Sequence, residues 1–109
     1  MAALTTTVVG LGGATVQWEP ADVAGDDCQT GAGVLLWVRN SDASSHTVTL
    51  VTPGTVNGLG IDDRVVPVAA GADVPIPVIS DYRDPSTGRA SITYDAVTSV
   101  EVAVIRVPV

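Results

Sequence analysis

The chain has 109 residues, of which 46% are hydrophobic, and 12 acidic side chains against five arginines give it a formal net charge of −7. This length fits one domain with its own core, and the acidic charge argues against binding to nucleic acid or to an anionic membrane. The only cysteine, Cys28, excludes an intrachain disulfide, and we expect it to be a small buried or half-buried hydrophobe.

β-Branched residues are abundant, whereas lysine is absent and glutamate occurs only twice. Such side chains suit pleated sheets better than helices, and 11 glycines and seven prolines supply many turns. The composition therefore predicts an all-β protein. Residues 1–10 lack the positive start and apolar core of a signal peptide, and no apolar run approaches about 20 residues, so we expect neither a signal peptide nor a membrane-spanning helix.

The N-terminal region begins with a short apolar and threonine-rich run, residues 4–9. This run predicts a first strand, or an arm that pairs with a neighbouring molecule. The glycines of residues 10–13 predict a hinge after it. We therefore expect an N-terminal arm with its hinge at residues 1–13 and a β-domain at residues 14–109.

The clearest pattern in the chain is a pair of apolar runs separated by a polar turn. Residues 34–39 are apolar up to the last position, and residues 46–52 alternate in polarity. A short continuous apolar run is typical of a buried strand, and alternation is typical of a half-exposed one. These runs predict a hairpin. Before it, residues 15–18 alternate and predict a strand, and the acidic, glycine-rich residues 21–33 predict a loop.

Two tryptophans need an interpretation of their own. Trp37 lies in the most apolar predicted strand, and we expect it in the core. Trp18 lies near Pro20 after the glycine hinge, and both the core and an interface suit its large, amphipathic ring.

The second half of the chain predicts short strands with turns between them. Residues 55–64 form a connection with an Asn-Gly turn. Residues 65–68 contain a proline, which places that position at a sheet edge or at a strand end, and the alternating prolines of residues 73–79 predict an edge strand. Residues 80–88 predict a polar loop, and residues 89–94 alternate as a strand does.

The longest predicted strand is residues 99–107. Its alternation turns Val100, Val102 and Val104 toward the core, and turns Glu101, Ala103 and Ile105 outward or toward a partner. In total we expect about seven or eight short strands. Their number and spacing predict a single-domain antiparallel β-sandwich or barrel of jelly-roll or immunoglobulin-like type.

Candidate catalytic and metal-binding residues are few. His46 lies close in sequence to Asp42, Ser44 and Ser45, but a catalytic triad normally converges from separate parts of a chain. We therefore expect a surface histidine at a strand start, and we assign no catalytic residue and no enzyme activity.

Aspartates cluster in three loops, and aspartate supplies both calcium ligands and turn-capping groups. The first loop lacks the full calcium-binding pattern, so we interpret the clusters as turn chemistry and assign no metal or cofactor. The clusters are Asp22, Asp26 and Asp27; Asp62 and Asp63; and Asp81 and Asp84.

A family resemblance begins at the predicted hairpin. The stretch VRNSDASSHTVT at residues 38–49 runs into TPGTVNGL at residues 52–59, and Asp63-Arg64, Val66-Pro67-Val68 and Ala70-Gly71-Ala72 follow. This region resembles the short structural proteins encoded among the head genes of tailed bacteriophages of high-GC hosts. The resemblance covers roughly residues 34–78, and the use of arginine without lysine fits such a genome.

The resemblance implies a decoration, or cement, protein on an icosahedral phage head. Its partner would be the major capsid protein, its location the capsid surface of the virion, and its state a homo-oligomer, often a trimer. A tail or head–tail connector subunit, or a carbohydrate-binding or adhesive β-sandwich, are the alternatives. As candidate contacts with partners we select residues of the N-terminal arm, one tryptophan and the outward side of the last strand: Leu4, Thr6, Val8, Trp18, Ala103 and Ile105.

Overall fold

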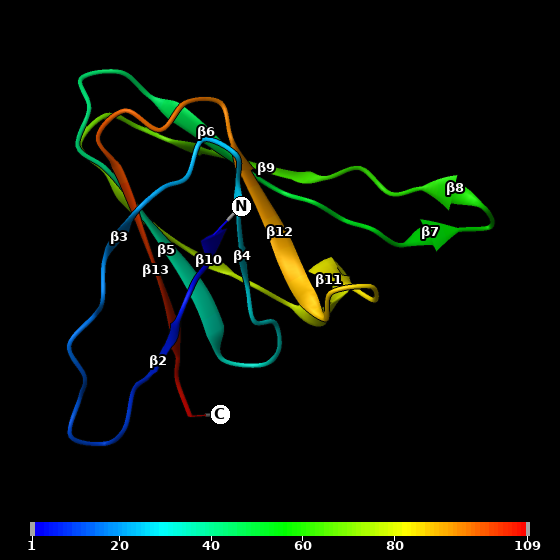
Figure 1. Cartoon of the computed structure of the whole chain (residues 1–109), viewed down its shortest axis with the longest axis horizontal. Coiled ribbons are helices and arrows are strands. Elements are labelled where there is room, and N and C mark those ends of the chain that lie inside the picture. The colour runs from blue at the N-terminus through cyan, green and yellow to red at the C-terminus, as the bar shows by residue number, and fades with distance from the viewer. Residues whose placement is uncertain (1, 109) are drawn as a thin grey trace.

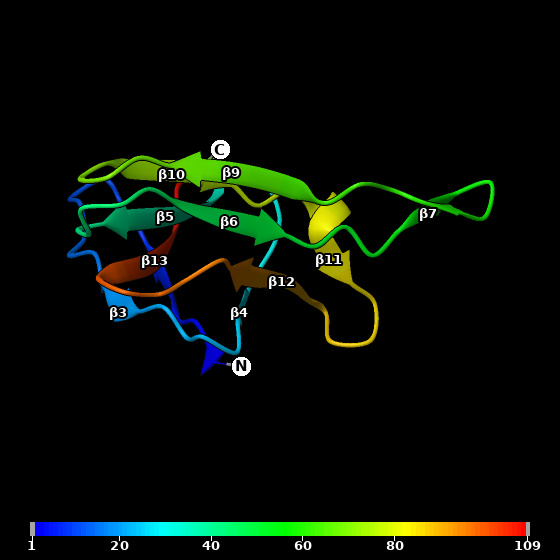
Figure 2. The ribbon, with the colours of Figure 1, turned by 90° about the horizontal axis from the view of Figure 1, so that it is seen from above.

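Two β-sheets packed against each other form the body of the protein (Figure 1, Figure 2). This computed structural model describes residues 2–108. Met1, the first residue of the predicted arm at 1–13, and Val109, the last residue of the predicted domain at 14–109, lie outside the described residues. Buried apolar side chains from both sheets form one core. The predicted all-β, sandwich-like fold is confirmed.

The first sheet has six strands, and all its pairs are antiparallel except the pair of β1 with β4. In spatial order, the strands are β1 (Ala2–Ala3), β4 (Asp26–Cys28), β12 (Arg89–Tyr94), β6 (His46–Leu50) and β9 (Arg64–Val68), and β11 (Arg83–Asp84) also pairs with β12.

The second sheet has five strands, and only the pair of β2 with β13 is parallel. In spatial order, the strands are β10 (Asp73–Pro77), β5 (Val34–Asn40), β13 (Val100–Arg106) and β2 (Thr6–Val8), and β3 (Glu19–Pro20) also pairs with β13. The two sheets hold more strands than the seven or eight expected, because several are only two or three residues long.

A small hairpin and one helical turn complete the described elements. Strands β7 (Thr55–Val56) and β8 (Leu59–Gly60) pair only with each other within residues 2–108. They project from the body of the molecule (Figure 1, Figure 2). The 3-10 helix η1 (Ser80–Tyr82) places Tyr82 in the core.

The central correction concerns the predicted hairpin, because β5 and β6 do not pair with each other. β5 lies between β10 and β13, whereas β6 lies between β12 and β9 in the other sheet. Residues 41–45 therefore carry the chain from one sheet to the other as an arch. Asn40 holds this arch: its Nδ2 donates to the carbonyl oxygens of Ser44 (2.8 Å) and Val68 (3.1 Å), and its Oδ1 accepts from the N–H of Asp42 (3.0 Å).

The sequence of β5 is a continuous apolar run, and in the structure both of its faces are covered by other residues, one more completely than the other. One face, Val34, Leu36, Val38 and Asn40, is buried between the sheets, and the other face is half-buried. Trp37 lies on the half-buried face and outside the core cluster. The expectation that Trp37 is a core residue is therefore wrong.

β13 is the central strand of the second sheet, and its predicted core face is confirmed for Val100, Val102 and Val104. Its opposite face is not free, since Ala103 and Ile105 are only 3% and 6% exposed. The prediction that these two residues face outward is wrong. The alternation showed which face each residue occupies, but it could not show that this chain covers both faces.

The N-terminal residues belong to both sheets. β1 pairs with β4, β2 pairs with β13, and Leu4 between them is buried at 3% exposure. The N–H of Leu4 donates to the carbonyl of Asp27 (2.9 Å). These residues are therefore an integral part of the fold and do not form an arm that is free to pair with another molecule.

Two local predictions between residues 15 and 33 also differ from the structure. Residues 15–18 form no strand, and the segment predicted as a loop contains β4. Asp26 and Cys28 of β4 are fully buried, although their acidic, glycine-rich context is typical of a loop. The edge positions predicted for the proline-containing strands β9 and β10 are confirmed.

Candidate functional site

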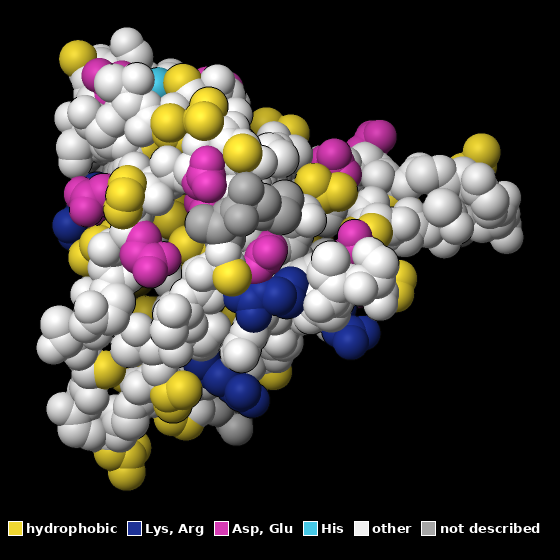
Figure 3. All heavy atoms as spheres, in the orientation of Figure 1, with side chains coloured by type: hydrophobic (Ala, Val, Ile, Leu, Met, Phe, Trp, Pro, Cys, Tyr) yellow, Lys and Arg dark blue, Asp and Glu magenta, His cyan; other side chains and the backbone are white. Residues whose placement is uncertain are grey.

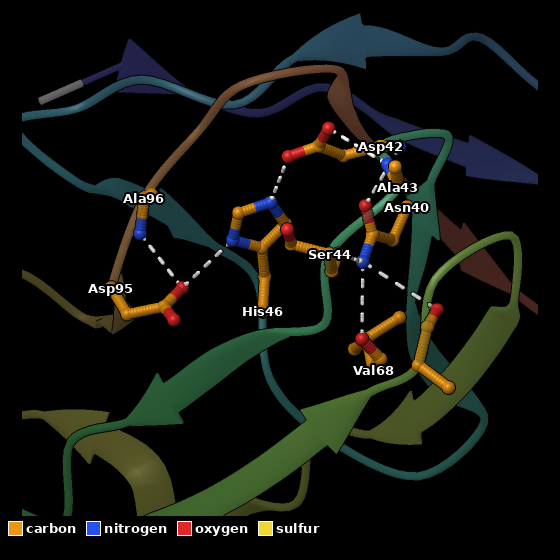
Figure 4. A network of polar contacts seen from close by, with 9 residues as sticks. Asn40, Asp42, Ala43, Ser44, His46, Val68, Asp95 and Ala96 are labelled. Carbon is orange, nitrogen blue, oxygen red and sulfur yellow. Dashed lines mark hydrogen bonds and ion pairs between the residues drawn. The ribbon is translucent and has the colours of Figure 1, made fainter.

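The connection between β5 and β6 places His46 between two carboxylates (Figure 4). Its Nε2 lies 2.9 Å from Oδ2 of Asp42, and its Nδ1 lies 3.4 Å from Oδ1 of Asp95. A neutral imidazole carries only one N–H, so only the charged ring can donate toward both carboxylates. His46 is 8% exposed, and the prediction of a surface histidine is wrong.

The pKa values of both carboxylates, Asp42 and Asp95, are lowered in this arrangement. The hydrogen bond with His46 and one from the N–H of Ala43 lower the pKa of Asp42. For Asp95, partial desolvation opposes the change, but backbone hydrogen bonding at Thr47, the hydrogen bond from the N–H of Ala96 and the nearby histidine lower the pKa. Since carboxylates face both ring nitrogens, neither nitrogen is free to accept a proton from a nucleophile. The contacts of His46 with Asp42 and Asp95 link the connection between β5 and β6 to the connection that follows β12.

A second polar cluster lies inside the first sheet. The hydroxyl of Tyr94 donates to Oδ2 of Asp26 (2.6 Å), whereas Oδ1 of Asp26 is buried without a hydrogen-bond partner. Burial raises the pKa of the Cys28 thiol to about 12 and also raises the pKa of Tyr94. A thiol with so high a pKa carries almost no thiolate at neutral pH, so Cys28 is a structural residue, as expected.

The two tryptophans meet on the outer side of the second sheet. Their ring centroids are 6.3 Å apart in an edge-to-face arrangement, and the guanidinium carbon of Arg39 lies 4.0 Å from the centroid of Trp18. Ala103 is the register partner of Trp37, so Ala103 and Trp37 lie side by side in the second sheet. A sugar-binding platform needs an open aromatic face, and here Arg39 covers one face of Trp18.

Of the six candidate contact residues, only Val8 is well exposed, at 69%. Leu4, Ala103 and Ile105 are buried, and Thr6 and Trp18 are half-buried. The structure therefore leaves Val8 as the one member of that set with most of its side chain available to a partner.

Sequence reasoning missed a neighbour of Val8. Leu11 lies in the turn of residues 10–13, where the N–H of Gly13 donates to the carbonyl of Gly10 (3.0 Å), and its side chain is fully exposed. We call residues 8–13 the N-terminal turn. A leucine inside a glycine run was the available signal, but the run was interpreted only as a hinge.

A second exposed apolar region lies at the opposite end of the molecule, where the β7–β8 hairpin (residues 52–61) projects. Leu59 is 72% exposed and Ile61 is 43% exposed. At the base of the hairpin is a groove of about 600 Å³, whose lining includes Ile61, Ile79 and Tyr82. An adjoining hollow of about 370 Å³ between β9 and β10 shares Ile79 and Tyr82. We call the two together the edge groove.

Neither a search for metal ligands nor a comparison with known proteins assigns a function to this chain. Within residues 2–108, no three histidine, cysteine or acidic side chains gather as metal ligands. The described part of the chain also has no helix of the length and apolarity needed to cross a membrane. No protein-family model matches this chain, and neither a curated protein nor a solved structure was found to be similar to it.

Proposed function

We propose that this chain is a structural virion protein that decorates the head of a tailed bacteriophage by binding the lattice of its major capsid protein. The observation that carries the proposal is the N-terminal turn, which presents Val8 and Leu11 to solvent at 69% and full exposure. The resemblance of residues 34–78 to phage head proteins supports the class of partner. The proposed location is the capsid surface, and the proposed state there is a homo-oligomer, with a trimer favoured.

The N-terminal turn is suited to a contact because its first residues are anchored to β13 and a hydrogen bond within the turn closes it. β2 pairs with β13, and the N–H of Val9 donates to the carbonyl of Arg106 (2.9 Å). The Gly10–Gly13 hydrogen bond then closes the turn. Apolar side chains held in place before binding lose little conformational entropy when a partner covers them. This favours a contact through the turn.

Two features favour this function over the other classes. Carboxylates face both ring nitrogens of His46, which leaves neither nitrogen open to a nucleophile. Arg39 covers a face of Trp18, which weakens the case for a carbohydrate-binding module. A tail or connector subunit remains the main alternative within a virion, and it predicts rings on the tail or portal instead of density over the head.

The test is to mix the purified protein with bare phage heads and to image the particles by cryo-electron microscopy. We expect density at regular lattice positions, and loss of that density with Leu11→Asp and Val8→Asp. Val23→Asp is the matched control, because Val23 is 79% exposed and lies outside the N-terminal turn. Deletion of residues 1–10 is a poor test, because it removes Leu4 from the core.

The outcomes separate the candidate functions. Heads without added density would refute decoration. Rings bound only to tails or portals would favour the connector, and binding on a glycan array would favour the adhesive module. Equal binding by Leu11→Asp, Val8→Asp and Val23→Asp would show that another surface makes the contact.

A further inference from the structure

The β7–β8 hairpin has a defined shape but lacks a partner sheet within the described residues. Asn57 and Gly58 have φ values of 53° and 78°, as the tight Asn-Gly turn of a hairpin requires. A two-stranded hairpin alone is at best marginally stable in water. Leu59, at 72% exposure, adds an apolar side chain near the end of this projection. The hairpin therefore gains stability if another surface covers it.

The edge groove is an apolar hollow that begins at the base of the same hairpin. Its floor combines Ile79, which is 46% exposed, with Val66, Val74, Ile76 and Tyr82 from the space between β9 and β10. The prolines of β10 lack N–H groups and lie at the open edge of their sheet, so this edge is a poor template for an added strand. The groove is thus suited to side chains that insert into it.

Charge restricts what can enter this groove. Asp62, Asp63 and Asp81 lie around it with Arg64, and Oδ1 of Asp63 accepts a hydrogen bond from the N–H of Thr52 (2.8 Å). Residues 52–61 carry no charged side chain. Figure 3 shows the same contrast, with acidic side chains near the base of the hairpin and none along it. A neutral hairpin can therefore approach the groove without like-charge repulsion.

We propose that the β7–β8 hairpin of one copy of this chain binds in the edge groove of a second copy, with Leu59 against Ile79 and Tyr82. Two copies with a charge of −7 each repel one another over most of their surfaces, and the uncharged hairpin is the projection that bridges them. Each copy carries one hairpin and one groove, so the contact can close as a reciprocal pair or as a ring. The proposal does not depend on the virion function, since it uses residues far from Val8 and Leu11.

The first test measures the mass of the purified full chain by light scattering after size exclusion. We expect a mass at least twofold above the 11.0 kDa of one chain. Leu59→Asp and Ile79→Asp should each raise the dissociation constant by about tenfold or more, as loss of a central apolar contact does. Val23→Asp is again the control and should leave the mass unchanged. Because both test positions are exposed, circular dichroism should show that all three variants are folded.

The second test identifies the two surfaces in contact. Leu59→Cys and Ile79→Cys are made in separate chains, mixed and oxidised, and we expect a disulfide-linked pair that forms at least tenfold faster than in a mixture of Leu59→Cys with Val23→Cys. Cys28 does not compete, because it is fully buried. Salt gives an independent readout: an apolar contact between two acidic copies should tighten with ionic strength, whereas a cationic partner in the groove would be released.

Three results would overturn the proposal. The first is a wild-type chain that stays at 11.0 kDa up to millimolar concentration in high salt. The second is an oligomer whose mass neither aspartate variant changes. The third is the absence of a selective cross-link between Leu59→Cys and Ile79→Cys. A chain that self-associates but does not bind capsids would reject only the proposal of capsid decoration. A chain that binds capsids but does not self-associate would reject only the proposal that the hairpin binds the edge groove.

Discussion

Replacement of Asn40 tests how the chain crosses from one sheet to the other. Asn40 is 1% exposed, and its amide makes hydrogen bonds to Ser44, Val68 and Asp42 at 2.8, 3.1 and 3.0 Å. Each such bond contributes about 0.5–1.5 kcal/mol net, and a buried group that loses its partner costs about 1–3 kcal/mol. For Asn40→Ala we therefore expect a loss of about 3 kcal/mol in the free energy of unfolding, which lowers Tm by about 10–20 °C in a domain of this size.

The assay is urea unfolding followed by circular dichroism, with Ser45→Ala as the control. Ser45 lies in the same connection but is exposed, so its loss should change stability by less than about 0.5 kcal/mol. Asn40→Asp is the sharper variant. At neutral pH its carboxylate would face the carbonyl oxygens that Nδ2 now contacts, and it should destabilise at least as much as alanine does. At low pH the protonated form regains a donor and should recover part of the loss.

One result would refute this reasoning. If Asn40→Ala and Ser45→Ala have the same stability, the amide does not hold the arch, and strand pairing alone keeps β5 and β6 in separate sheets. A loss for alanine without any pH dependence for aspartate would instead indicate that packing volume matters and that the hydrogen bonds do not.

Three further predictions use matched variants or conditions. Gly33→Ala should lower the free energy of unfolding by about 2–3 kcal/mol, and Gly71→Ala by only about 1 kcal/mol. Both glycines have φ near +75° to +80°, but only at Gly33 would the added Cβ meet the backbone of Val107. Equal urea midpoints for the two variants would contradict this. Tyr94→Phe should cost about 2 kcal/mol in thermal unfolding, since it removes the shorter of the two hydrogen bonds to Oδ2 of the buried Asp26 (2.6 Å) and leaves only the one from the N–H of Asp22 (3.3 Å). The folded pKa of Asp42 lies below its ordinary value of 3.8, so stability is full above that pH and falls as pH drops below it; Asp42→Asn should flatten this acid limb.

The sequence predicted which segments are extended far better than it predicted how they pair. Alternation places the core faces of β6, β12 and β13 correctly, because a period of two depends only on local exposure, whereas the continuous apolar run of β5 assigned no face. It cannot distinguish a hairpin from an arch. That choice depends on the bond between Asn40 and Val68, which are 28 residues apart, and on neighbours of each strand that come later in the chain.

The buried polar residues were mispredicted for the same reason. Asp26 has the local context of a loop, and the shorter of the two hydrogen bonds to its buried carboxylate comes from Tyr94, 68 residues away. His46 follows a polar turn, as a surface histidine would, but Asp95 arrives from the end of β12 and encloses it. In both cases one of the groups that compensate the burial lies in a distant segment, and a single sequence gives no means of identifying that group.

The two proposed contact surfaces can operate together because of where they lie. The N-terminal turn and the tip of the β7–β8 hairpin point away from opposite ends of the molecule (Figure 1). The molecule as a whole is thin, with extents of 40 × 36 × 20 Å. A thin body anchored at one end leaves its other end free to reach a neighbour. If the turn binds a shell, hairpin–groove contacts between adjacent copies add avidity without any new contact with the shell. Leu59→Asp should then weaken the avid binding of many copies to heads and leave the binding of a single copy to the shell unchanged. Leu11→Asp should abolish both the avid and the single-copy binding to heads.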